Sequence, residues 1–265
     1  MTIQLALESP ISMMSELCPL GSIELCFIHL LKEKESIYRK YYFDAKGKGR
    51  FLILDNGIME LGYSMSTDDL LLTASDLKPD LVTPPETLGD GASTLNLTYE
   101  FIRAFESSKL YPTTKILGVA HGSDFKSWCS TFQELSQIPY IARIGIPYRI
   151  PFDIFTQNMS CSNKLKTLVT RRIEICDWIA ENHPTSQVHL FGLAHPSELP
   201  FHTKHKFIKS IDTSLPIMAA VKNISYEVSN LGPYEKEILD MNLPHSELIV
   251  KGATHNINVM KQILQ

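Results

Sequence analysis

The sequence predicts an α/β fold, a single (β/α)8 TIM barrel that occupies residues 1–265 as one domain. Short apolar runs rich in β-branched residues recur along the chain, and stretches with helical periodicity separate them. Runs that are apolar on both faces indicate parallel strands buried on both sides, and the alternation with helices indicates βαβ units. The length of 265 residues suits a single barrel, since this fold commonly takes about 250 residues.

Seven strands are expected in order, most of which end in small or polar residues. They are the segments 23–31 (IELCFIHLL), 51–57 (FLILDNG), 80–86 (DLVTPPE), 115–122 (KILGVAHG), 140–148 (YIARIGIPY), 188–195 (VHLFGLAH) and 208–214 (IKSIDTS). The segment 216–224 (PIMAAVKNI) is expected to supply the eighth strand, and the segments 91–108 and 163–182 are expected to be helices. No G-x-G-x-x-G turn opens the chain, which favours a barrel over an open doubly wound sheet.

Composition excludes several classes of protein. No run of about 18 apolar residues is present that could span a membrane, and the N-terminal stretch lacks the basic start of a secretory signal. The five cysteines are odd in number and include no C-x-x-C pair, which indicates a reducing, cytoplasmic location rather than a disulfide framework. The net charge of −4 gives no global attraction to nucleic acid, so a polyanion would need a local basic patch.

In a barrel, the carboxyl ends of the strands form the rim at which active sites are built. The residues expected there are polar, small or aromatic: Asp55, Asn56, Glu86, His121, Arg143, Gly145, Tyr148, His195, Asp212 and Thr213. Each also has an ordinary structural explanation. Asp55, Asp90 and Asp212 could instead cap helices, and His121 could be an ordinary loop residue. His195 could lie in a turn, with Ser197 as the cap of the helix that follows. Met59 and Phe191 could belong to the apolar core.

Three motifs in order narrow these alternatives. ILDNG (53–57), HLFGLAHPSEL (189–199) and SIDTSLP (210–216) resemble motifs of the tRNA-guanine transglycosylase superfamily, and most closely those of the phage and bacterial DNA-guanine transglycosylases. The resemblance covers roughly residues 51 to 216. It implies a (β/α)8 barrel that exchanges guanine in a polynucleotide for a 7-deazaguanine base and requires no cofactor.

The resemblance also implies the roles of two carboxylates. Asp212 matches the nucleophile, and Asp55 matches the general acid and base that also contacts the nucleobase. Exchange with retention of the sugar configuration needs two inversions through a covalent sugar–enzyme intermediate, for which a carboxylate is a suitable nucleophile. A second carboxyl group is then needed to protonate the departing guanine.

The remaining candidates are implied to hold the nucleobase. Glu86 takes the place of an acidic residue that reads the guanine edge, with Asp90 as the alternative. His121 and Gly145 match residues that hold the base and let it approach the backbone. The flat faces of the base are assigned to Phe191 and Met59, and Asn56 helps to shape the pocket; these residues complete the implied site.

Departures from the tRNA enzymes favour DNA as the substrate. The tRNA enzymes carry three cysteines and a histidine around a structural zinc after the nucleophile, whereas no cysteine follows Cys176 here, and the chain is also shorter. The expected partners are double-stranded DNA and a free 7-deazaguanine, and protection of phage DNA from restriction is the expected purpose. The alternatives left open are an enzyme acting on RNA, a barrel hydrolase or lyase of small molecules, and a nucleic-acid-binding barrel without catalysis.

A local basic segment is a candidate for phosphate contacts. Residues 32–50 carry seven basic and three acidic residues, interleaved with Tyr38, Tyr41, Tyr42 and Phe43. The alternative is a solvated amphipathic helix whose tyrosines face the core. Residues 164–172 and 202–206 form further basic clusters.

Overall fold

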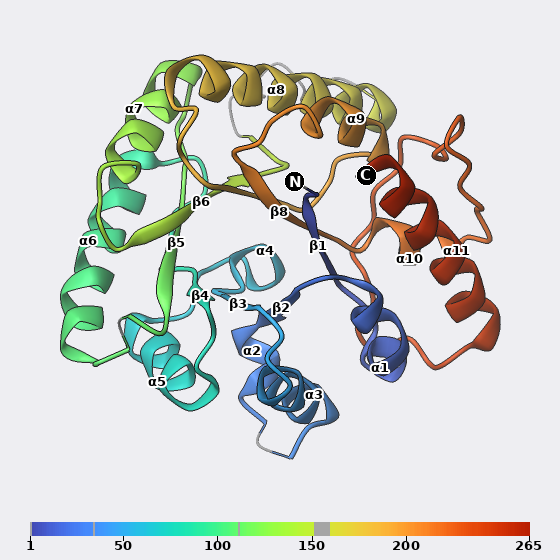
Figure 1. The fold of residues 1–265 in the computed structure, drawn as a ribbon, viewed down its shortest axis with the longest axis horizontal. Helices are drawn as coiled ribbons and strands as arrows, with labels where there is room; N and C mark the ends of the chain where they lie inside the picture. The colour runs from blue at the N-terminus through green and yellow to red at the C-terminus, as the bar shows by residue number, and fades with distance from the viewer. Residues whose placement is uncertain (1, 34, 111, 151–159) are drawn as a thin grey trace. The chain divides into compact units, whose positions relative to one another are not determined.

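The computed structural model describes residues 2–33, 35–110, 112–150 and 160–265. Eight strands form one sheet in the order β1-β8-β7-β6-β5-β4-β3-β2, and the registers given for neighbouring strands are parallel. Helices separate most of the successive strands, so the fold is of the (β/α)8 TIM-barrel class that the sequence predicts (Figure 1). The strands are β1 Gln4–Leu7, β2 Glu24–Phe27, β3 Leu52–Asp55, β4 Leu81–Val82, β5 Lys115–Val119, β6 Ile141–Pro147, β7 Val188–Phe191 and β8 Ile208–Thr213.

Several of the longer helices begin after a capping side chain. Ser36, Ser66, Asp90, Asp124 and Ser160 each accept a hydrogen bond from a backbone N–H of the first turn that follows. The α-helices are α1 Met14–Leu17, α2 Ile28–Leu31, α3 Ile37–Gly47, α4 Ile58–Leu61, α5 Thr67–Leu77, α6 Gly91–Ser107, α7 Phe125–Leu135, α8 Cys161–Asn182, α9 Leu199–His202, α10 Leu215–Val221 and α11 Glu247–Ile263. Short 3₁₀ helices are η1 Ile11–Met13, η2 Cys18–Leu20 and η4 Pro196–Glu198. No described helix is both long enough and apolar enough to cross a membrane.

The eighth strand is not the one predicted. Residues 216–224 fall largely in α10, where Pro216 occupies the first turn and helix-forming residues follow it. The missing strand is β1, close to the start of the chain, which pairs with β8 so that Ala6 lies opposite Asp212. Asp55 therefore ends the third strand rather than the second, and Asp212 lies in the eighth rather than the seventh.

The first expected strand is also shorter than predicted. Of the segment 23–31, only Glu24–Phe27 is a strand, and Ile28–Leu31 forms α2. A continuous apolar run does not distinguish a buried strand from a strand followed by a buried helical turn. The helices predicted over 91–108 and 163–182 are confirmed as α6 and α8.

Internal contacts divide the chain into two compact units. One comprises Met1–Ser22 and Pro147–Gln265, and the other comprises Ile23–Ile146. In the first, α10 packs against α11, and Leu165, Leu168 and Val169 of α8 pack with Ala194. In the second, α6 packs against α7 (Figure 1). The largest fully buried side chains of this unit are aromatic: Trp128, Tyr38, Phe101, Phe105 and Phe132. We call them the terminal unit and the central unit.

Candidate active-site residues

In the terminal unit, β8 delivers Asp212 to a buried, strongly polar position. The side chain is only 3% exposed. Its Oδ1 atom lies 2.9 Å from Nε2 of His189 on β7, and the other ring nitrogen of His189 lies 2.7 Å from the Ser210 hydroxyl. Asp212, His189 and Ser210 thus form a hydrogen-bonded chain that fixes the orientation of the carboxyl group.

Gly192, directly after β7, supplies a backbone donor to the same carboxyl group. Its N–H lies 3.1 Å from each oxygen of Asp212. Its φ of +60° is a conformation that glycine adopts readily, and a Cβ at this position would lie 2.9 Å from Cδ1 of Tyr148. Only glycine therefore fits the turn that aims this N–H at Asp212.

Two further ionisable residues complete this group, which we call the Asp212 cluster. Glu8 follows β1, its N–H donates to the carbonyl of Thr213 at 3.2 Å, and its side chain is hydrogen-bonded to Asp212. Lys236 donates to the carbonyl of Leu193 at 2.7 Å, and its ammonium nitrogen lies 3.4 Å from the centroid of the Tyr148 ring.

The pKa values of Asp212 and Lys236 are both lowered by their surroundings. Burial alone raises the pKa of Asp212, but hydrogen bonds from His189 and Glu8, the electrostatic effect of His189 and the Gly192 amide outweigh burial, so the pKa is lowered overall. Burial lowers the pKa of Lys236 to about 8, despite the opposing influence of Glu8 and Asp212. Asp212 is thus held as an anion at neutral pH, beside a cation that titrates close to neutrality.

A buried ion pair between Arg172 and Glu198 holds the backbone next to this cluster. The guanidinium of Arg172 on α8 donates to both carboxylate oxygens of Glu198 at 2.8 and 2.7 Å, and both side chains are fully buried. The third nitrogen of Arg172 donates to the carbonyl of Phe191 at 3.1 Å. Because Phe191 directly precedes Gly192, Arg172 fixes the backbone that carries the donor to Asp212.

In the central unit, β3 ends at Asp55 and a tight turn follows. Asp55 is buried, and its Oδ1 accepts a hydrogen bond from the N–H of Gly57 at 2.8 Å. Gly57 has a φ of +76°, and a Cβ there would lie 2.8 Å from Nδ1 of His29. Asp55 closes this turn and does not cap a helix.

Asn56, Glu86 and His121 form a buried hydrogen-bonded chain in the same unit. The amide nitrogen of Asn56 donates to Oε1 of Glu86 at 3.0 Å and to the carbonyl of Pro84 at 2.7 Å. Nε2 of His121 lies 2.6 Å from Oε2 of Glu86. The structure thus brings together three residues that the resemblance assigns to the base pocket. We call these three residues and Asp55 the Asp55 cluster.

The other predicted residues, Gly145, Phe191 and Met59, do not belong to either hydrogen-bonded cluster. Gly145 is buried in β6, where its carbonyl accepts from the N–H of Ala120 at 3.1 Å. Phe191 packs edge-on against the ring of His189, with centroids 4.5 Å apart. Met59 lies in α4 and is 42% exposed. Roles in base stacking remain predictions for Phe191 and Met59.

Two capping assignments are resolved by the hydrogen bonds. Asp90 is exposed and caps α6 by accepting from the N–H of Ser93 at 3.0 Å, which is the structural role considered for it. The expectation that Ser197 caps the helix after His195 is wrong. His195 itself is the cap of η4: its ring accepts from the N–H of Ser197, and Glu198 completes a capping box.

The basic segment 32–50 folds as the alternative interpretation describes. Tyr38 and Tyr42 of α3 are 1% and 2% exposed, so the expectation that they stack on nucleic acid is wrong. Arg39 pairs with Asp76, Lys46 with Asp80 at 2.6 Å, and Arg50 with Glu24 at 2.6 Å. Lys34 lies outside the described residues. These ion pairs reduce the positive charge that the segment offers to a phosphate backbone.

Sequence reasoning missed Glu8, His189, Gly192 and Lys236. Glu8 follows a strand of only four residues that was not predicted. His189 carries a usable signal, because a histidine within a buried apolar strand needs a polar partner. Lys236 lies outside helices and strands and has no periodic pattern that marks it.

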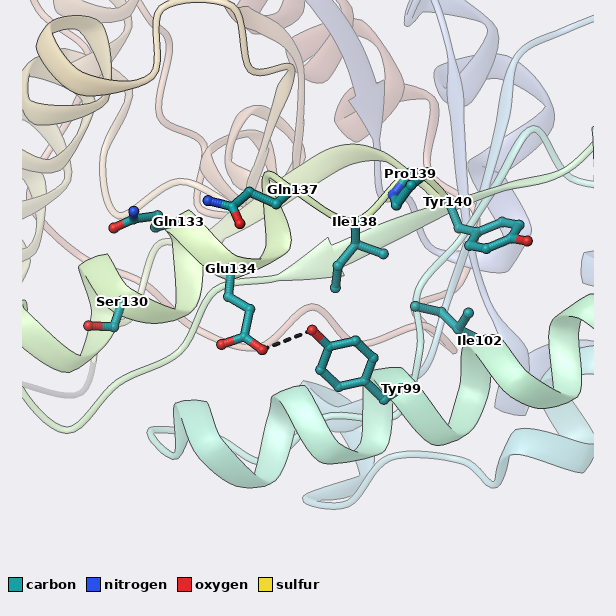
Figure 2. A pocket seen from close by; sticks show the side chains of 9 residues that line it. All are labelled: Tyr99, Ile102, Ser130, Gln133, Glu134, Gln137, Ile138, Pro139 and Tyr140. Carbon is teal, nitrogen blue, oxygen red and sulfur yellow. Dashed lines mark hydrogen bonds between the residues drawn. The ribbon is translucent and has the colours of Figure 1, made fainter.

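A hollow of about 680 Å³ lies at a different place in the central unit. Figure 2 shows the hydroxyl of Tyr99 on α6 turned toward Glu134 on α7, to which it donates at 2.8 Å. The hollow contains none of the predicted site residues and is lined by Tyr99, Ile102, Ser130, Gln133, Glu134, Gln137, Ile138, Pro139 and Tyr140. It does not alter the assignment of the candidate residues.

None of the five cysteines forms a disulfide. Within the described ranges, no group of three or more histidine, cysteine or acidic side chains is arranged to hold a metal ion. No protein-family model matches the chain, and no curated protein sequence matches it. The functional assignment therefore depends on the motifs and on the geometry of the two clusters.

Proposed function

We propose that this protein is a DNA-guanine transglycosylase, which exchanges guanine in double-stranded DNA for a free 7-deazaguanine base by double displacement. Asp212 is the nucleophile and Asp55 the general acid and base. The observation that carries the proposal is the environment of Asp212, a buried carboxylate held by His189 and the Gly192 amide with a lowered pKa. A side chain that must attack an anomeric carbon at neutral pH needs to be ionised and fixed in this way.

In the first displacement, an Asp212 oxygen forms a bond to C1′ of the nucleotide as the bond from C1′ to N9 of guanine breaks. The guanine leaves with the bonding electron pair, and the carboxyl group of Asp55 supplies a proton to it. The second displacement reverses these steps with the 7-deazaguanine, whose ring N–H proton passes to Asp55. Two inversions at C1′ restore the original sugar configuration.

The chain of Asn56, Glu86 and His121 supports recognition of the base. Guanine presents N–H donors on its Watson–Crick edge, and the carboxyl group of Glu86 has lone pairs beyond those used by Asn56 and His121. A base inside a duplex must first be extruded, which costs a few kcal/mol that such contacts offset. We propose that the exchange of guanine in phage DNA protects that DNA from restriction.

The test is a mass analysis of nucleosides after incubation of the protein with duplex DNA and each of three 7-deazaguanines, which bear a nitrile, an amidine or an amine side group. We expect one of the modified nucleosides to form in DNA with the wild-type protein and none with the Asp212→Ala variant. Transfer RNA is offered in parallel. A product in RNA alone makes the protein an RNA enzyme, and no product in either contradicts the proposal and favours a barrel without this catalysis.

A further inference from the structure

We propose that the first half of α8 binds the phosphate backbone of the DNA strand that carries the target guanine, through the ammonium groups of Lys164 and Lys166. We call these two lysines, with the ring of Tyr234, the α8 basic surface. The inference rests on the proposed function, because it takes Asp212 as the residue that attacks the sugar. It goes beyond that function by stating which face of the terminal unit holds the substrate.

Charge is distributed unevenly along α8. Residues 160–173 contain four basic residues and no acidic one, and the first acidic residue of the helix is Glu174. The basic residues are Lys164, Lys166, Arg171 and Arg172. A surface that binds the phosphates of a nucleic acid needs positive charge without acidic neighbours, and the first half of α8 has this composition.

Two of these four side chains are already occupied by acidic partners. Arg172 belongs to the buried ion pair described above, and Arg171 pairs with Glu174 at 3.2 Å. Lys164 is half-buried and Lys166 is exposed, and neither is paired with an acidic side chain in the part of the chain that the structure describes. Their two positive charges are therefore the ones that this helix offers to a phosphate backbone.

The packing of α8 places its first half beside the carboxyl ends of β7 and β8. Leu165 and Leu168 are buried and pack with Ala194, which follows β7. Ala194 lies two residues after Gly192, whose N–H contacts both oxygens of Asp212. The lysines alternate with these buried leucines, so they lie on the turns of α8 that pack against the loop next to the proposed nucleophile.

Tyr234 joins Lys166 to the same loop. The ammonium nitrogen of Lys166 lies 5.4 Å from the centroid of the Tyr234 ring, and His195 stacks on this ring with centroids 3.9 Å apart. The hydroxyl of Tyr234 lies 2.7 Å from that of Ser197. A contact with an aromatic ring occupies none of the three ammonium protons with an acceptor lone pair, so Lys166 can still donate to a phosphate oxygen.

The other two basic clusters of the sequence are less suited to hold this strand. Ion pairs with acidic side chains reduce the positive charge of residues 32–50. In the cluster 202–206, Lys204 pairs with Asp177 at 2.8 Å. This cluster also precedes β8, and the four residue steps from Ile208 to Asp212 span roughly 13 Å of extended strand. It therefore lies toward the end of β8 that is remote from the proposed nucleophile.

The salt dependence of DNA binding tests the α8 basic surface without requiring base exchange. The probe is a fluorescently labelled DNA duplex, and its anisotropy gives the binding constant between about 50 and 200 mM salt. The double variant Lys164→Gln/Lys166→Gln should bind more weakly, and the slope of log K against log[salt] should become less steep by roughly 1 for each lysine. The loss should be the same for duplexes of different sequence, because phosphate contacts do not read bases.

A matched control removes the same charge from the other basic segment. Lys40 in α3 and Lys48 at its end are exposed, and Lys40→Gln/Lys48→Gln should keep the wild-type slope. Lys164→Arg/Lys166→Arg should also keep it, because arginine retains the charge and contacts phosphate. In the exchange reaction, the glutamine variant of the α8 basic surface should raise KM for DNA and leave KM for the free base unchanged. Thermal unfolding of each variant shows whether it is folded.

The outcomes separate this inference from the proposed function. If Lys164→Gln/Lys166→Gln keeps the wild-type slope, or if the α3 control loses as much slope, the α8 basic surface is overturned, whether or not the wild-type protein exchanges bases. If the slopes change as expected but no base is exchanged, the proposed function fails and the surface stands. Wild-type protein that binds transfer RNA but not duplex DNA, or neither, overturns the assignment of this surface to a DNA strand.

Discussion

The Asp212 cluster and the Asp55 cluster contain carboxyl groups in contrasting surroundings. Asp212 lies among His189, Glu8 and Lys236 and accepts hydrogen bonds from the Gly192 amide. Asp55 accepts a hydrogen bond from its own turn, and the next residue begins a chain of amide, carboxyl and imidazole groups. The first cluster is rich in charge, whereas the second is rich in directional donors and acceptors.

This difference suits two separate parts of one reaction. A nucleophile at an anomeric carbon must stay anionic, and the partners of Asp212 lower its pKa. A planar, neutral base is recognised by hydrogen bonds of fixed direction, which the chain of Asn56, Glu86 and His121 can supply. The comparison therefore predicts unequal consequences when equivalent substitutions are made in the two clusters.

The largest effect is expected from Asp212→Asn, compared with Asp55→Asn. The first change removes the attacking oxygen anion and should reduce exchange by roughly 10⁴-fold or more. The second removes proton transfer and should reduce exchange by roughly 10² to 10⁴-fold. Initial rates of incorporation of a labelled base into DNA measure both.

Two exposed aspartates provide matched controls. Asp240→Asn lies in the terminal unit and Asp68→Asn in the central unit, and neither should change the exchange rate appreciably. A larger loss for Asp55→Asn than for Asp212→Asn would reverse the assigned roles. Wild-type rates in both cluster variants would show that neither carboxyl group takes part.

A large effect on stability is expected from Arg172→Met, because it leaves Glu198 buried without its bidentate partner. The free energy of unfolding should fall by about 3–5 kcal/mol, the usual cost of breaking a buried ion pair. Arg171→Met, one residue earlier, removes only an exposed pair with Glu174 and should cost no more than about 1 kcal/mol. Urea unfolding followed by tryptophan fluorescence measures both values.

The fall in the free energy of unfolding at acid pH provides a further check on the same ion pair. Burial alone raises the pKa of Glu198, but Arg172 and His202 outweigh burial and lower it from 4.5 to about 2. The pair therefore contributes stability above pH 4.5 that is lost as the pH falls toward 2. Arg172→Met removes the largest cause of the lowered pKa, so its stability should fall less steeply between pH 4.5 and 2 than that of the wild-type protein. An unchanged pH dependence and equal stabilities of the two arginine variants would show that the pair does not stabilise the fold.

The sequence predicted the fold better than it predicted the composition of the clusters. Seven apolar runs were enough to place seven strands, because buried parallel strands have a continuous apolar signal. The eighth failed for a physical reason: Gln4–Leu7 is a strand only because β8 pairs with it, whereas PIMAAVKNI is compatible with either a strand or a helix. Glu8 and Lys236 were missed because contacts between distant parts of the chain place them. Glu8 is placed by the pairing of β1 with β8, and Lys236, which lies outside helices and strands, is placed by its hydrogen bond to the carbonyl of Leu193.

The smallest effect is expected in the Asp55 cluster, from Glu86→Gln. Glutamine keeps the size of the side chain but replaces one acceptor oxygen with a donor, which opposes the N–H groups of guanine. It should raise KM for the base roughly tenfold, equivalent to about 1.4 kcal/mol, with a smaller change in kcat. Asp90→Asn is the control, because Asp90 is exposed and caps α6, so KM should not change. If Asp90→Asn raises KM and Glu86→Gln does not, Asp90 reads the base, and the buried chain of Asn56, Glu86 and His121 serves only to hold β3 and the segments after β4 and β5 together.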